Sequence, residues 1–111
     1  MATKEEYFDS AMSTMAAGNL DAAITDLKAA TELEPHFADA LQALAMLYYQ
    51  TQRFDEAIEA GKRLVAANPD DIMYHTSLSM FYVAKGMVPE AEAEANESRR
   101  LTWKQQLKAK K

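Results

Sequence analysis

The chain of 111 residues contains no cysteine and only three glycines and three prolines. Without cysteine it can form no disulfide, no thiolate zinc site and no cysteine nucleophile. The scarcity of helix-breaking residues, with 49% apolar content, favours helices over sheets or disorder. No apolar run approaches the roughly 18 residues of a membrane-spanning helix, and no apolar segment follows the charged N-terminal residues as in a secretory signal. We therefore expect one α-helical domain in the cytoplasm.

Negative charge dominates all but the end of the chain. Residues 1–98 hold 17 acidic side chains against 6 basic ones, a balance of −11, whereas residues 99–111 hold 6 basic and no acidic ones, a balance of +6. Nucleic acid binding requires a basic surface, so the acidic body argues against nucleic acid as the main partner. The composition favours a protein or peptide partner over nucleic acid or membrane.

Identical residues recur at a spacing of 34 positions. Three sets have this spacing: Met12, Met46 and Met80; Ala23, Ala57 and Ala91; Pro35 and Pro69. A fixed period of this length is typical of stacked helical hairpins, because one hairpin cannot bury its apolar face alone. The sequence therefore predicts a helical repeat protein.

Capping and helix-breaking residues divide each repeat into two helices. Thr3 and Glu6 form a capping box at the first helix start. Gly18 ends that helix, Asn19 caps the next one, and Pro35 prevents its continuation. The same signals predict helices over residues 4–17, 20–33, 37–50, 54–67, 72–84 and from 89 to about 109.

The spacing of small and apolar residues resembles the tetratricopeptide repeat family across residues 4–103. Repeat one carries the segment from Gly18 to Ile24, then Leu27, Ala30 and Pro35 at the family's second-helix positions. The resemblance implies an all-α, right-handed superhelical solenoid of three helical hairpins with an extended C-terminal helix. One domain would cover residues 1–111, with repeats at about 4–37, 38–71 and 72–103 and a basic helical extension at 99–111.

Gly61 departs from the family pattern, which has a large residue at this helical position. Glycine inside a helix costs up to about 1 kcal/mol relative to alanine, so its presence needs a packing reason. We expect Gly61 to make room for an aromatic side chain from the helix over residues 72–84, either Tyr74 or Phe81.

In this family the first helix of each hairpin lines a concave groove. The matching positions here form a methionine-rich floor: Phe8, Met12, Met15, Gln42, Met46, Tyr49, Met73, Thr76, Met80 and Val83. Acidic residues would form its rim: Glu5, Asp39, Asp70 and Asp71. Because methionine is polarizable and adaptable, we predict an adaptor or scaffold groove that binds an apolar, basic peptide or helix. The alternative is that the methionines are only core residues.

The family's groove for chaperone C-termini uses lysine, arginine and asparagine to hold a carboxylate. The matching positions here are Phe8, Met12, Ala43, Met73 and Ser77, and none carries a positive charge. The resemblance therefore implies a protein-binding groove without that carboxylate clamp.

Two other functions stay open, a small chaperone that masks an apolar client segment and a structural protein that assembles through its basic tail. On a straight helix Trp103 and Leu107 lie on one side, about 100° or more from Ala91. Trp103 could fold back on the last hairpin, the tail could dock on a neighbouring copy, or its lysines could weakly contact an anionic membrane or nucleic acid.

The sequence offers little for catalysis or metal binding. His36 and His75 are the only histidines and are not spaced as a metal-binding pair. We expect His36 in a solvated turn and His75 partly buried in the hairpin packing. The three glycines are isolated, so no phosphate-binding loop is indicated. We predict no enzymatic activity, no cofactor and no catalytic or metal-binding residues.

Overall fold

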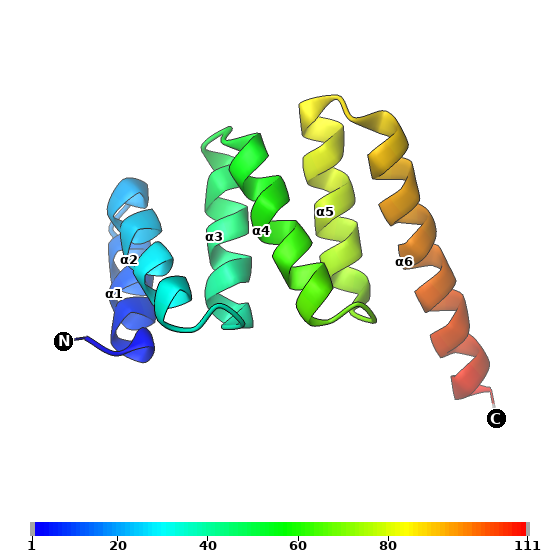
Figure 1. Cartoon of the computed structure of the whole chain (residues 1–111), viewed down its shortest axis with the longest axis horizontal. Coiled ribbons are helices and arrows are strands. Elements are labelled where there is room, and N and C mark those ends of the chain that lie inside the picture. Colours follow the sequence, from blue (N-terminus) through cyan, green and yellow to red (C-terminus); the bar gives the residue numbers. More distant parts are fainter. Residues whose placement is uncertain (1, 111) are drawn as a thin grey trace.

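Six helices account for most of the chain in the structure, a computed structural model that describes residues 2–110. They are α1 (Lys4–Ala16), α2 (Leu20–Leu33), α3 (Ala38–Gln50), α4 (Phe54–Ala67), α5 (Ile72–Lys85) and α6 (Val88–Ala109). They follow one another in a row, with α1 and α6 at opposite ends (Figure 1). The prediction of an all-α solenoid of helical hairpins is confirmed. Met1 and Lys111, which the predicted domain includes, lie outside the described residues.

The predicted helix caps are present. The Thr3 hydroxyl accepts a hydrogen bond from the Glu6 amide at 3.1 Å, and the Glu6 carboxylate accepts one from the Thr3 amide at 3.2 Å. The Asn19 side chain accepts from the Ala22 amide at 3.2 Å and starts α2. Gly86 ends α5 with a φ of 82°, a left-handed conformation that glycine adopts without strain. Four of the predicted helix ends shift by one residue: α1 and α3 are shorter because Ala17 and Phe37 are cap residues, whereas α5 and α6 each extend one residue further toward the turn between them.

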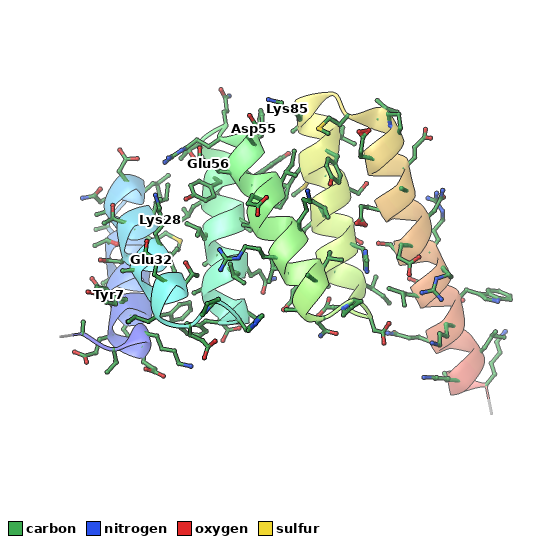
Figure 2. All side chains as sticks on the ribbon, viewed as in Figure 1. Tyr7, Lys28, Glu32, Asp55, Glu56 and Lys85 are labelled. Carbon is green, nitrogen blue, oxygen red and sulfur yellow. The ribbon has the colours of Figure 1, made fainter. Side chains whose placement is uncertain are left out.

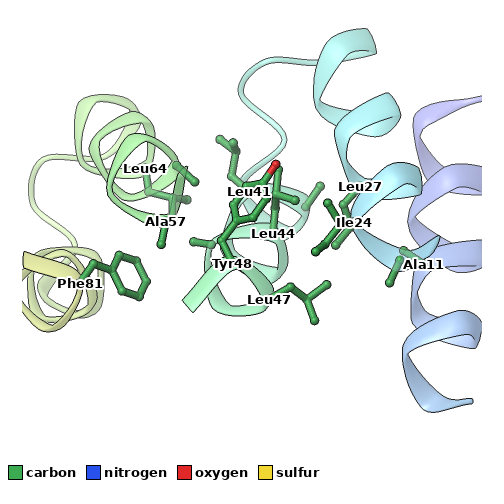
Figure 3. Packing of buried hydrophobic residues seen from close by; sticks show 14 of the residues in the cluster. Ala11, Ile24, Leu27, Leu41, Leu44, Leu47, Tyr48, Ala57, Leu64 and Phe81 are labelled. Carbon is green, nitrogen blue, oxygen red and sulfur yellow. The ribbon is translucent and has the colours of Figure 1, made fainter. Parts of the chain in front are cut away.

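The apolar core is one continuous cluster of buried side chains from successive helices. Leu27, Leu41, Leu64 and Phe81 are each at most 1% exposed and come from α2, α3, α4 and α5 in turn. Figure 3 shows these side chains between the helices, with Ala11 of α1 at the opposite end from Phe81. Each hairpin therefore buries its apolar face against its neighbour, as stacked repeats require.

Gly61 lies where α4 meets α5. A Cβ atom at this position would stand 3.1 Å from Leu78 Cδ1 and 3.3 Å from Phe81 Cδ2. Any side chain would therefore press on the fully buried Phe81 ring. The prediction that Gly61 makes room for an aromatic residue of α5 is confirmed for Phe81; Tyr74 is not among the nearest atoms.

The end of α6 projects beyond the hairpin that it forms with α5 (Figure 1). The Ser98 hydroxyl donates to the carbonyl of Ile72, the first residue of α5, and Leu101 is the last buried residue of α6. The two helices are therefore paired only up to about Leu101. Trp103 is 61% exposed and Leu107 is 46% exposed. The alternative in which Trp103 folds back on the last hairpin is therefore wrong, because α6 continues straight past the end of α5.

Candidate functional site

The ten predicted groove residues, which we call the Met face, all lie on the first helices of the hairpins, α1, α3 and α5. Met12, Met46 and Met80 occupy equivalent positions on these helices and are half-buried against the core. Met15 is half-buried in the same way. These methionines are neither fully buried nor fully exposed. Part of each side chain therefore packs against the core, and the rest is accessible to solvent.

Ring contacts hold the two aromatic residues of the Met face in place. The Phe8 ring packs on Phe37, which precedes α3, with 5.4 Å between ring centroids. The Tyr49 ring packs on both Phe81 and Phe54, at 5.5 Å and 5.9 Å. Tilted aromatic pairs at this distance contribute about 0.5–1.5 kcal/mol beyond the area they bury. Phe8 and Tyr49 therefore form rigid parts of the surface, whereas the methionines between them can adapt.

The most accessible apolar side chains of the Met face lie on α5. Met73 is 64% exposed and Val83 is 62% exposed. They are ten residues apart, which corresponds to about 15 Å along the helix axis. Gln42 and Thr76 are also exposed and add hydrogen-bonding groups. The third hairpin therefore presents the most exposed apolar side chains of the Met face to a partner.

The predicted acidic rim divides into two pairs. Glu5 and Asp39 are exposed at the starts of α1 and α3. Asp71 instead caps α5, where its carboxylate accepts a hydrogen bond from the Tyr74 amide at 3.3 Å. Asp70 lines a small hollow together with Lys104 and other residues of α6. The charge of Asp70 is thus close to the basic residues Lys104 and Lys108 of its own chain.

The structure also contains a hollow that the sequence analysis did not predict. It has a volume of about 210 Å³ between α2 and α4, with Leu44 and Tyr48 of α3 among its lining residues. Lys28 and Glu32 of α2 and Glu56 of α4 surround it with mixed charges (Figure 2). Charged residues at the exposed positions of α2 and α4 are the only sequence signal for it, and a solvated helix surface gives the same signal.

His75 is buried, as predicted, and both of its ring nitrogens have partners. Nδ1 lies 3.0 Å from a Glu94 carboxylate oxygen and Nε2 lies 2.6 Å from the Pro69 carbonyl oxygen. Burial, the largest influence, lowers the pKa of His75, but the two hydrogen bonds and the charges of Glu94 and Glu97 outweigh it and raise the pKa above 6.5. Because both partners are acceptors, the geometry favours the doubly protonated ring.

This arrangement predicts a pH-dependent contribution to stability. A group whose pKa is raised on folding stabilises the protein fully below its unfolded pKa of about 6.5, and the contribution is lost as the pH rises through the folded-state value. We expect His75→Gln to lower the free energy of unfolding by about 1–3 kcal/mol at pH 6. The difference from wild type should shrink by pH 9 in urea titrations; a constant difference would contradict a charged His75.

His, Asp and Glu side chains are dispersed over residues 2–110. In this part of the chain no three or more His, Asp or Glu side chains gather as a metal ion would need. None of the helices described there is both long and apolar enough to cross a membrane. His36 is exposed, and its amide donates to the Glu34 carboxylate at 3.2 Å.

Several solved structures share the fold of this chain. A crystal structure of MamA protein superposes with a TM-score of 0.84 and 26% identity, covering 92% of this chain and 56% of the MamA chain. The first TPR of Spaghetti (RPAP3) bound to the HSP90 peptide SRMEEVD has a TM-score of 0.79 and 16% identity, covering 89% of this chain and 79% of that one. The CopN-Scc3 complex gives a TM-score of 0.82 and 13% identity, covering 88% of this chain and 58% of that one.

A family model agrees with this structural likeness. This chain spans little more than half the length of the MamA chain. No curated protein matches its sequence. A family model described as tetratricopeptide repeat matches residues 14–81, which is more than half of the chain and includes α2, α3, α4 and most of α5. The chain therefore belongs to the tetratricopeptide repeat family.

Proposed function

We propose that this chain is a protein–protein interaction module that binds an apolar, basic peptide or helix on its Met face. The observation that carries the proposal is the exposure of Met73 and Val83 beside a row of half-buried methionines. Membership of the tetratricopeptide repeat family supports it. Two structural neighbours are bound to a peptide and part of a complex, respectively, which supports a protein partner.

The charge of the Met face favours a basic partner over an acidic one. The RPAP3 domain is bound to the peptide SRMEEVD, which ends in acidic residues. Here the positions that the family uses for a carboxylate clamp carry no cation, and Glu5 and Asp39 are exposed nearby. Acidic side chains at the edge of an interface steer oppositely charged partners and reject similarly charged ones. We infer that the ligand combines apolar anchors with lysine or arginine.

The spacing of the exposed anchors limits the shape of the ligand. Met73 and Val83 are about 15 Å apart, a distance that about three turns of a helix or about five extended residues can span. Met80 lies between them, is half-buried, and can re-pack around different side chains. The Met face therefore suits a short helix or strand-like segment that presents two apolar groups separated by this distance.

A comparison of matched variants tests this proposal. The double variant Met73→Glu/Val83→Glu changes two exposed side chains, so the fold should be retained. The control Leu33→Glu/Val88→Glu adds the same charge at two exposed apolar positions outside the Met face, at 50% and 54% exposure. Immobilised wild type and control should capture the same proteins from an extract of the source cells, and the Met-face variant should lose them. Equal capture by all three chains would contradict binding at the Met face.

A further inference from the structure

The projecting end of α6, residues 99–110, exposes apolar as well as basic side chains. Trp103 and Leu107 lie one turn apart and are 61% and 46% exposed. Arg99, Arg100 and Lys104 surround them, and residues 99–111 contain no acidic residue. We call this segment the tail. An exposed tryptophan on a basic amphipathic helix is the kind of side chain that dominates binding energy in interfaces.

The first helix of the solenoid is not built to receive another hairpin. On α3, Leu44 and Leu47 are buried against the neighbouring hairpin, at 4% and 1% exposure. The residues 34 positions earlier, on α1, are Ser10 and Ser13, and both are exposed. A second copy would gain little from stacking there, because there is no apolar surface to bury.

The outer side of α6 is polar in the same way along its paired part. On α4, Ile58 is buried and Val65 packs against the core. Their equivalents 34 positions later are Glu92 and Arg99, and both are exposed. Copies of the chain are therefore not expected to join end to end into a longer solenoid, and the tail is the apolar surface that remains available beyond the paired part.

The tail matches the ligand that the Met face is proposed to bind. It combines two apolar side chains with lysine and arginine, and the rest of the chain has a balance of −11. It cannot reach the Met face of its own chain, because α6 continues as one helix to Ala109 and points away from the row of helices (Figure 1). An acceptor within the same protein must therefore belong to another molecule.

We propose that the tail of one molecule binds the Met face of a second copy. This inference rests on the proposed function, since it names one ligand for the same site. Trp103 and Leu107 pack against Met80 and Val83, which are likewise about one turn apart, and the tail cations approach exposed acids such as Asp39. The contact is heterologous, so an open dimer keeps one free tail and one free Met face, and assemblies grow with concentration.

Sedimentation velocity of the full chain from about 1 µM to 1 mM tests the proposal. Wild type should increase in mass with concentration, and less so when the salt is raised to about 0.5 M, because the charges are exposed. The tail variant Trp103→Ser/Leu107→Ser and the Met-face variant Met73→Glu/Val83→Glu should each be monomeric. The control Leu33→Glu/Val88→Glu should associate like wild type.

Mixing the two monomeric variants gives the decisive result. The tail variant has an intact Met face and the Met-face variant has an intact tail, so an equimolar mixture should form a 1:1 dimer and no larger species. A monomeric mixture, or continued self-association of either variant, would overturn the proposal. A wild type that stays monomeric at all concentrations would also overturn it.

The capture experiment distinguishes failure of this inference from failure of the proposed function. The tail variant should still capture other proteins through its intact Met face. If wild type is monomeric but captures proteins that the Met-face variant does not, only tail docking is wrong. If the Met-face variant captures the same proteins as wild type, the proposed function itself is wrong.

Discussion

Replacing Phe81 by alanine should lower the free energy of unfolding by about 3–5 kcal/mol, the usual cost of deleting a buried aromatic side chain. Phe81 has 0% exposure and contacts both Gly61 of α4 and the Tyr49 ring of α3. It therefore joins the second hairpin to the third. Because each repeat depends on its interface with the next one, the third hairpin should unfold at a lower urea concentration than the rest. Far-ultraviolet circular dichroism in urea measures the loss.

The partner residue provides a test of the same contact from the other side. Gly61→Leu should destabilise the chain by about 1–3 kcal/mol or more, because a side chain there meets Leu78 and Phe81 at 3.1–3.3 Å already at its Cβ atom. In the double variant Gly61→Leu/Phe81→Ala the new side chain fills the space that the ring leaves. Its destabilisation should be smaller than the sum of the single effects by about 1–3 kcal/mol. Additive losses would contradict the contact. Leu33→Ala, at an exposed position, serves as the control.

The second large effect concerns binding by the Met face. Met73→Glu/Val83→Glu should weaken the affinity for a captured partner about 100-fold, equivalent to about 2.7 kcal/mol. Complete burial of one such apolar side chain contributes about 1.5–3 kcal/mol, and two new carboxylates would have to lose water to bind. Isothermal titration calorimetry with the purified partner measures the change. The control Leu33→Glu/Val88→Glu should stay within about threefold of wild type, within the range of exposed substitutions.

Exposed positions make this a cleaner test than the methionines of the repeat. Met46 is half-buried against the core, so Met46→Glu would also place a charge partly inside the protein and destabilise it. A loss of binding in that variant could then result from unfolding. An unchanged affinity in the exposed double variant would show that the ligand does not contact α5 at these positions.

The repeat spacing and the capping residues were sufficient to predict the fold. Pro35 and Gly86 end helices because of the backbone conformation of these residues themselves. The side chains of Thr3 and Asn19 cap helices by accepting hydrogen bonds from amides only three residues later in the sequence. Gly61 could be interpreted because a glycine inside a helix requires a close neighbour. The sequence limited this neighbour to Tyr74 or Phe81 but could not decide between them, because the choice depends on how α5 is rotated about its axis relative to α4.

The candidate site was harder to predict than the fold. Half-burial of Met12, Met46 and Met80 depends on the distance between neighbouring helices, which helical periodicity does not define. Asp71 was assigned to the rim, yet it caps α5, since aspartate before a helix has both uses. The alternative in which Trp103 folds back on the last hairpin was wrong, because the sequence could not show that α6 extends beyond the part that pairs with α5.

Methyl NMR of the ¹³C-methionine-labelled chain, titrated with a captured partner, tests binding at the Met face most directly. Met12, Met15, Met46, Met73 and Met80 report on this face, and Met87, in the turn between α5 and α6, is an internal control. We expect the resonances of the first five to shift or broaden with partner concentration while Met87 stays unchanged. Shifts confined to Met87, or none at all while the partner remains bound, would contradict it.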